Sequence, residues 1–180
     1  MPNWCGNNLT ISHDDPAMIQ KFCDAYNSGE TMQAFLPCPQ ELRDTMSGSY
    51  GKGTPEQKAL EKQQAANVKK HGHPTWYEWN IANWGTKWDF GRGKDDDKIE
   101  PSDANTVRDL NFQTAWSPPI EFFDHLCRLG YRVRVLYCEP GCGFCGIYEN
   151  GDDDTIQLDS SLDDVPDEIV DCFGLEEVES

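Results

Sequence analysis

The chain has 180 residues, a formal net charge of −17 and a sequence pI of about 4.4. This length suits one domain with its own core. The charge excludes a general nucleic-acid binder that neutralises phosphates and argues against docking on an anionic membrane, and no apolar run of about 18 residues is present to span a bilayer. The first residues lack the basic and apolar regions of a signal peptide, so we expect a cytoplasmic protein with reduced thiols.

The predicted elements begin with a strand and a helix. Residues 7–12 alternate polar and apolar side chains, which is typical of a strand. The Asp-Asp-Pro sequence at 14–16 predicts the start of a helix, and Gly29 ends it. A short strand is expected at residues 32–36, closed by two prolines, and a helical turn is expected near Glu41.

Residues 43–108 are expected to form an insertion. The Thr-Pro-Glu-Gln sequence at 54–57 matches a capping box with proline at the first helical position. It predicts a polar, solvent-facing helix that extends to about Lys70. A short aromatic helix is predicted at residues 75–83, and the Gly- and Asp-rich residues 89–105 predict a loop.

Regular elements return after the insertion. A strand is predicted before Trp116, and the Ser-Pro-Pro sequence that follows starts a helix with a broad apolar face. Three further strands and a short acidic helix complete the chain. In order, the expected ranges of these six elements are 109–115, 120–129, 131–137, 143–149, 155–158 and 166–173.

Without the insertion, the order of these elements resembles a ferredoxin-like split βαβ sandwich of the α+β class. We therefore predict one ferredoxin-like domain over residues 1–180, with a helical insertion at 43–108 and an acidic C-terminal segment at 151–180. The name of the fold describes topology only. Neither iron nor any other cofactor is expected.

The negative charge is concentrated near the C-terminal end. Residues 135–180 hold 14 acidic residues and no Lys or Arg. One interpretation is a solvated surface that aids solubility. The other is an acidic face that imitates nucleic acid and binds a basic surface of a host or defence protein. A calcium loop is disfavoured because the spacing lacks alternating ligands and a terminal Glu. The candidate partner-binding residues are Asp152, Asp153, Asp154, Asp159, Asp163, Asp164, Asp167 and Glu168.

Three of the eight cysteines are closely spaced. Cys138, Cys142 and Cys145 resemble the iron–sulfur motif of radical S-adenosylmethionine enzymes, and the last two resemble a zinc knuckle. The chain is too short after this motif for the barrel of those enzymes, and no second Cys-x2-Cys pair is present. Partly buried hairpin cysteines are therefore the favoured interpretation. No metal ligand is assigned, and a Cys-rich metal-binding protein stays an alternative.

Residues 76–89 hold four tryptophans and form the most distinctive segment. Tryptophan with nearby Asn and Asp can stack on a sugar or base and hydrogen-bond to it. The other interpretation is that these rings pack the insertion onto the sheet, with Tyr77, Ile81 and Trp84 on one helix face. The ligand-binding candidates are Trp79, Asn83, Trp84, Lys87, Trp88, Trp116 and Glu139.

No residue set specifies a reaction. The four histidines have no nucleophile or acid–base partner at a telling spacing. Phosphate-binding glycine loops, nucleophile elbows and the His-Glu-x-x-His motif are absent from the sequence. A non-enzymatic protein is therefore favoured, without excluding an enzyme.

Three groups of residues together resemble a known family. They are Met-Pro-Asn-Trp-Cys at 1–5 with Asn7 and Leu9, the sequence Asn-Trp-Gly-Thr-Lys-Trp-Asp at 83–89, and residues 112–119 with 139–141 and 144–146. The set resembles the YubB-type ferredoxin-like family of plasmid and bacteriophage proteins, over roughly residues 1–40 and 75–150. The resemblance implies a fold and a mobile-element setting, and it implies no activity.

The sequence therefore favours a phage or plasmid accessory protein that binds and modulates or inhibits a host or defence protein. We expect no direct contact with nucleic acid or membrane. A small ligand-binding protein or enzyme that uses the Trp76–Asp89 segment is the main alternative. The sequence does not specify the partner or the oligomeric state.

Overall fold

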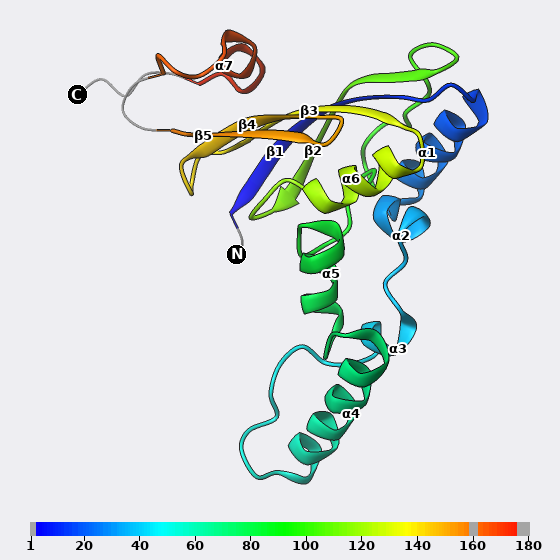
Figure 1. Cartoon of the computed structure of the whole chain (residues 1–180), viewed down its shortest axis with the longest axis vertical. Helices are drawn as coiled ribbons and strands as arrows, with labels where there is room; N and C mark the ends of the chain where they lie inside the picture. The colour runs from blue at the N-terminus through cyan, green and yellow to red at the C-terminus, as the bar shows by residue number, and fades with distance from the viewer. Residues whose placement is uncertain (1–2, 159–161, 176–180) are drawn as a thin grey trace.

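A five-stranded sheet forms the body of the molecule. The computed structural model describes residues 3–158 and 162–175. All neighbouring strands are antiparallel, and their order is β2-β1-β3-β4-β5 (Figure 1). The strands are β1 (Trp4–Ser12), β2 (Thr106–Ala115), β3 (Arg132–Glu139), β4 (Phe144–Glu149) and β5 (Asp152–Gln157).

Strands β2 and β3 flank β1 and run in the same direction, because each is antiparallel to β1. Helix α6 (Ile120–Arg128) connects them. A helix that joins two parallel strands separated by a third is the split βαβ unit. Strands β4 and β5 extend the sheet as successive antiparallel partners of β3. The structure therefore confirms the predicted α+β class and split βαβ topology.

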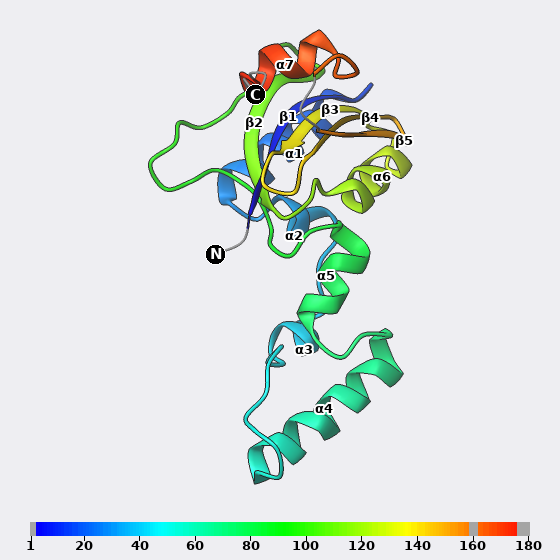
Figure 2. The same ribbon diagram turned by 90° about the vertical axis from the view of Figure 1, so that its left-hand side faces the viewer.

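The main core lies on one face of the sheet. Helices α1 (Pro16–Ser28), α2 (Thr31–Phe35) and α6 cover that face (Figures 1 and 2). Alternation along β1 turns Leu9 and Ile11 into this core. The apolar face of α6 adds Phe122, Phe123 and Leu126, which are fully buried.

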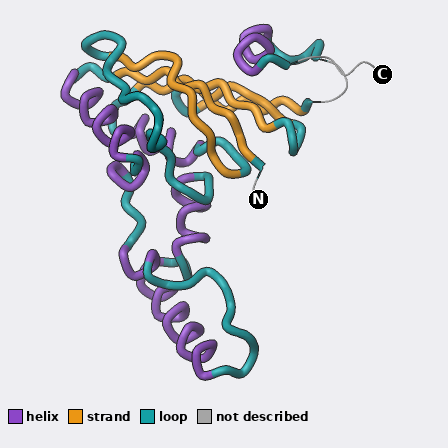
Figure 3. The backbone as a smooth tube through the Cα atoms, turned by 180° about the vertical axis from the view of Figure 1, so that it is seen from behind, coloured by secondary structure: helices purple, strands orange, loops and turns teal. Residues whose placement is uncertain are grey.

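A second, smaller core lies on the opposite face. Helix α7 (Asp167–Phe173) packs there, and Figure 3 shows the strands as a layer between helices. Leu136, Cys138 and Cys145 of the hairpin meet Val165 and Ile169 in this core. Both faces of β3 are thus covered, which explains its nearly continuous burial.

Residues 31–35 form helix α2, so the strand predicted at 32–36 is wrong. The side chain of Asp89 accepts hydrogen bonds from the backbone N–H groups of Met32 and Gln33 at 2.7 and 2.8 Å. These are free donors of the first helical turn, and a distant carboxylate satisfies them. Local sequence carries no sign of that contact. Helix α3 (Gln40–Arg43) confirms the predicted helical turn.

An arm extends from the body. Helix α4 (Pro55–His71) forms most of it, and α5 (Trp76–Trp84) connects it back to the sheet (Figures 1 and 2). The Thr54 side chain accepts from the Gln57 N–H, as the capping box predicted. Of the α4 residues, Leu60 and Asn67 are buried, which fits the expected polar helix.

The predicted insertion has two structural parts. Residues 44–75 belong to the arm, whereas the segment after them returns to the main core through Trp79, Trp84 and Phe90. Residues 89–105 contain no helix and no strand, as expected. In the described part of the chain, no helix has the length and apolar character needed to cross a membrane.

Candidate functional site

Helix α5 turns a different face inward from the one the sequence predicted. Its buried residues are Trp79, Asn80 and Trp84. Tyr77 and Ile81 are 39% and 40% exposed, so only Trp84 of the predicted face is internal. Apolar residues occur all around this helix, and its contacts with α3 and α6 decide which of them are buried.

Trp79 and Trp84 anchor α5 to the body. Their rings meet edge to face with centroids 5.7 Å apart. The Trp84 indole N–H donates to the Leu36 carbonyl at 2.9 Å. Asn83 donates to the Trp79 carbonyl at 2.8 Å within the same helix. These contacts support the predicted packing role of the segment.

Lys87 and Trp88 lie on the surface beside the start of β1. The Lys87 ammonium is 4.4 Å from the centroid of the Trp88 ring and 5.7 Å from that of Tyr77. The Trp88 ring centroid is 6.0 Å from that of Trp4. This group therefore presents aromatic surface to solvent.

Trp116 and Glu139 occupy two further environments. Trp116 is 46% exposed and has a φ of 74°, a conformation that bulky residues rarely adopt. Glu139 is 2% exposed, and its carboxylate accepts from the backbone N–H groups of Gly141 and Cys142. Glu139 thus holds the β3–β4 turn. The seven predicted ligand-binding residues do not converge on one site.

A cavity of about 320 Å³ lies where the arm meets the body. Of the predicted ligand-binding residues, Trp84 lines it. Trp76, Asn80 and Asp89 also fall within the segment that the sequence singled out, whereas the lining residues from α2, α3 and the loops around them carried no signal in the sequence. The lining residues are Gly29, Glu30, Gln33, Cys38, Arg43, Trp76, Asn80, Trp84 and Asp89.

Asp89 forms part of the wall of this cavity. Its carboxylate accepts from the N–H groups of Met32, Gln33 and Phe90 at 2.7 to 2.8 Å. Burial nevertheless raises the pKa of the Asp89 carboxyl to about 6, because desolvation disfavours the charged form. The nearby Glu30 carboxylate acts in the same direction.

A second cavity of about 390 Å³ lies between the end of α5 and strands β3 to β5. Gly85 of the tryptophan segment and Phe144 of the hairpin both line this cavity. The buried Tyr137 hydroxyl donates to Asp153 at 2.7 Å on its wall. Glu121 adds another carboxylate, so acceptor groups dominate the polar part of this lining.

Strand β5 splits the acidic run between two faces of the sheet. Ile156 packs into the core under α7, so alternation places Asp152 and Asp154 on that side. Asp153 points to the opposite side, where it meets Tyr137. The sequence grouped these three aspartates as one surface, and that grouping holds only for the first and third.

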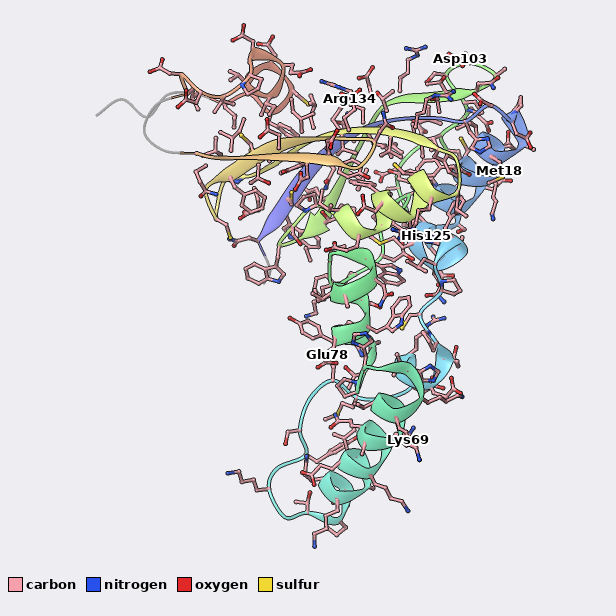
Figure 4. The ribbon with its side chains drawn as sticks, in the orientation of Figure 1. Met18, Lys69, Glu78, Asp103, His125 and Arg134 are labelled. Carbon is pink, nitrogen blue, oxygen red and sulfur yellow. The ribbon has the colours of Figure 1, made fainter. Side chains whose placement is uncertain are left out.

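The remaining acidic candidates lie around α7. Asp163, Asp164 and Asp167 are exposed. Glu168 accepts two hydrogen bonds from Arg134, both at 2.7 Å, and Arg134 also approaches Glu149 at 3.7 Å. Figure 4 shows Arg134 on the side of the sheet that faces α7. Asp159 falls outside the described residues.

The three closely spaced cysteines lie on a β-hairpin, as expected. Cys138 and Cys145 are direct cross-strand partners and are buried, and burial raises the pKa of Cys138 to about 11. Cys142 is exposed in the turn, 3.5 Å from the Asn3 amide nitrogen. Within residues 3–158 and 162–175, no three His, Cys, Asp or Glu side chains are placed to hold one metal ion.

Comparison with known proteins places the chain in a family. The family model described as the ferredoxin-like domain in Api92-like protein matches residues 84–176. The crystal structure of protein Api92 from Yersinia pseudotuberculosis matches with 12% identity and a TM-score of 0.44, covering 89% of this chain and 99% of that chain. No curated protein sequence matches significantly. Neither match concerns the YubB name or a phage or plasmid origin. The family model spans more than half of the 180 residues, and the chain therefore belongs to the family with the ferredoxin-like domain in Api92-like protein.

Proposed function

We propose that the protein is a non-enzymatic accessory protein that binds a basic surface of another protein. The binding surface is the acidic face, which we define by its residues on β5 and around α7. In the mobile-element setting that the sequence resemblance implies, the partner is a host or defence protein in the cytoplasm, and binding modulates or inhibits it. The acidic face comprises Asp152, Asp154, Asp163, Asp164 and Asp167.

The observation that carries this proposal is the one-sided charge of the C-terminal part of the sequence. No Lys or Arg follows Arg134 in the sequence. Arg134 is held by Glu168 and Glu149, and Arg132 is held by Asp14 at 2.8 Å. The arginines on this side thus already have anionic partners. A field of one sign steers a positively charged surface toward it and makes association dependent on salt.

Capture from a host lysate at low and high salt tests the proposal. The change that removes the acidic face replaces its five aspartates by asparagine, at Asp152, Asp154, Asp163, Asp164 and Asp167. A matched control removes five negative charges elsewhere, at Asp24, Glu56, Glu61, Asp95 and Asp97. We expect the first variant to lose the captured protein and the control to keep it.

The dissociation constant of any captured protein is then measured over a salt series. Affinity that falls steeply with salt for the wild type, and less steeply for the five-asparagine variant, supports the acidic face. Affinity that the five substitutions leave unchanged contradicts it.

A second candidate function is the binding of a small ligand by the Trp76–Asp89 segment. It is favoured by the cavity that Trp76 and Trp84 line, at about 320 Å³. Ligand sites are concave, partly aromatic and furnished with a few polar groups. This function is compatible with the first, because the two surfaces belong to different parts of the molecule (Figure 1).

A further inference from the structure

The cavity between arm and body contains a buried acceptor without a partner. Asn80 is 5% exposed and lines the cavity. Its amide N–H group donates to the Lys87 carbonyl at 2.9 Å, which orients the side chain. The Asn80 Oδ1 atom has no hydrogen-bond partner among the described residues. Buried carbonyls are nearly always paired, so this atom calls for a donor from the cavity.

Opposite charges border the same cavity. Arg43, at the end of α3, forms no ion pair with any described residue. Glu30 precedes α2 and lies close enough to Asp89 to act on its carboxyl group. Asp89 already accepts three backbone hydrogen bonds. The charged groups left for a ligand are therefore the Arg43 guanidinium and the Glu30 carboxylate.

Two indole rings supply the apolar part of the lining. The Trp84 N–H is already bound to the Leu36 carbonyl, so its ring offers only an apolar surface. Trp76 is partly buried and packs against the main core. A volume of about 320 Å³ is at the small end of ligand sites, which span roughly 300 to 1,000 Å³.

We propose that this cavity binds a free α-amino acid with an apolar side chain. Arg43 receives the carboxylate, the ammonium group donates to Asn80 Oδ1 and Glu30, and the side chain packs against Trp76 and Trp84. A simple anion is disfavoured by Glu30 and Asp89, and a simple cation is disfavoured by Arg43. A zwitterion satisfies both signs within one small volume. This inference rests on the second candidate function.

Titration calorimetry with the whole protein tests the ligand class. The probes are L-phenylalanine and L-leucine, compared with L-phenylalaninamide, which lacks the carboxylate, and N-acetyl-L-phenylalanine, which lacks the ammonium group. We expect the two amino acids to bind and each blocked analogue to bind at least about tenfold more weakly, because each loses a charged hydrogen bond.

Variants then assign the contacts. Arg43→Gln should weaken the binding of L-phenylalanine about tenfold or more. It should change the binding of L-phenylalaninamide little, because that analogue has no carboxylate to pair with Arg43. Asn80→Leu should weaken the binding of both compounds. Lys52→Gln is the matched control, since it removes one exposed positive charge on the arm far from the lining residues. Circular dichroism and thermal unfolding confirm that each variant is folded.

Two results would overturn the proposal in different ways. If the amino acids fail but a nucleoside or a sugar binds with dependence on Asn80, the ligand class is wrong and small-ligand binding at this cavity stands. If none of these probes binds the folded protein, both the ligand class and the second candidate function are wrong, and water alone fills the cavity.

Discussion

At the scale of single residues, Asp89 combines a structural role with an unusual environment. Its carboxylate joins the loop after α5 to the first turn of α2, and it lies in the wall of a cavity. Three N–H donors favour the charged form, yet desolvation outweighs them and raises the pKa to about 6. The folded protein therefore holds this proton more tightly than the unfolded chain does.

This difference predicts a specific pH dependence. Because the folded pKa lies above the unfolded value, the contribution of Asp89 to the free energy of unfolding is greatest below about pH 4 and declines as pH rises through about 6. We expect the free energy of unfolding of the wild type, relative to that of Asp89→Asn, to fall over that window by about 3 kcal/mol at most. Denaturant unfolding at several pH values measures it, and the comparison cancels the titration of other carboxyls.

A direct titration separates this effect from changes caused by the substitution. The side-chain carbon of Asp89 in the wild-type protein should titrate near pH 6 by nuclear magnetic resonance. A midpoint near 4, the value of an ordinary aspartate, would contradict the assigned environment.

At the scale of elements, locally capped helices were predictable and distantly capped ones were not. The caps of α1 and α4, Asp15 and Thr54, lie next to the helices they start. Helix α2 depends on Asp89, 57 residues from Met32, and its sequence alone suggested a strand. The alternation of polar and apolar side chains made β3 predictable. The aspartates at the start of β5 lack this alternation, so the predicted strand began only at residue 155.

The same distinction explains the candidate sites. Composition identified the tryptophan segment, and the sequence placed Trp84 among the ligand candidates. Asn80 and Asp89 fall within that segment, but Arg43 and Glu30 are ordinary polar residues elsewhere in the sequence. They become a candidate site only because α2, α3 and α5 meet beside the sheet, and no local pattern records that meeting.

Helix α7 offers a prediction at the scale of an element. Its Ile169 side chain is fully buried in the small core that also contains Leu136, Cys138 and Cys145 of the sheet. Ile169→Ala should lower the stability of this element by about 2 to 5 kcal/mol, because it leaves a cavity in a small core. Hydrogen exchange should then accelerate in α7 and change little in β1.

The exposed Asp171 provides the control on the same helix. Asp171→Ala should leave exchange in α7 nearly unchanged, since surface substitutions have small effects. Equal acceleration throughout the sheet in the Ile169 variant would instead show that α7 unfolds together with the whole domain.

At the scale of the whole molecule, charge is divided along the long axis. The arm lies at one end and α7 at the other (Figures 1 and 2). Residues 44–75 carry five lysines and three acidic residues, and Figure 4 shows Lys69 on this arm. The opposite end carries the acidic face. A net charge of −17 therefore describes a molecule with a strongly acidic end and a mildly basic arm.

This arrangement predicts that salt stabilises the folded protein. Like charges on β5 and around α7 repel one another in the compact state, and raising the ionic strength from about 0.01 M to about 0.15 M shortens the Debye length from about 30 Å to about 8 Å. Thermal unfolding should shift to higher temperature over that range. The five-asparagine variant at the acidic face should show a smaller shift, because it carries less repulsion to screen.

The matched variant with five charges removed elsewhere separates the effect of local charge from that of total charge. If both variants lose the salt response equally, the repulsion belongs to the net charge of the whole molecule and not to the acidic face.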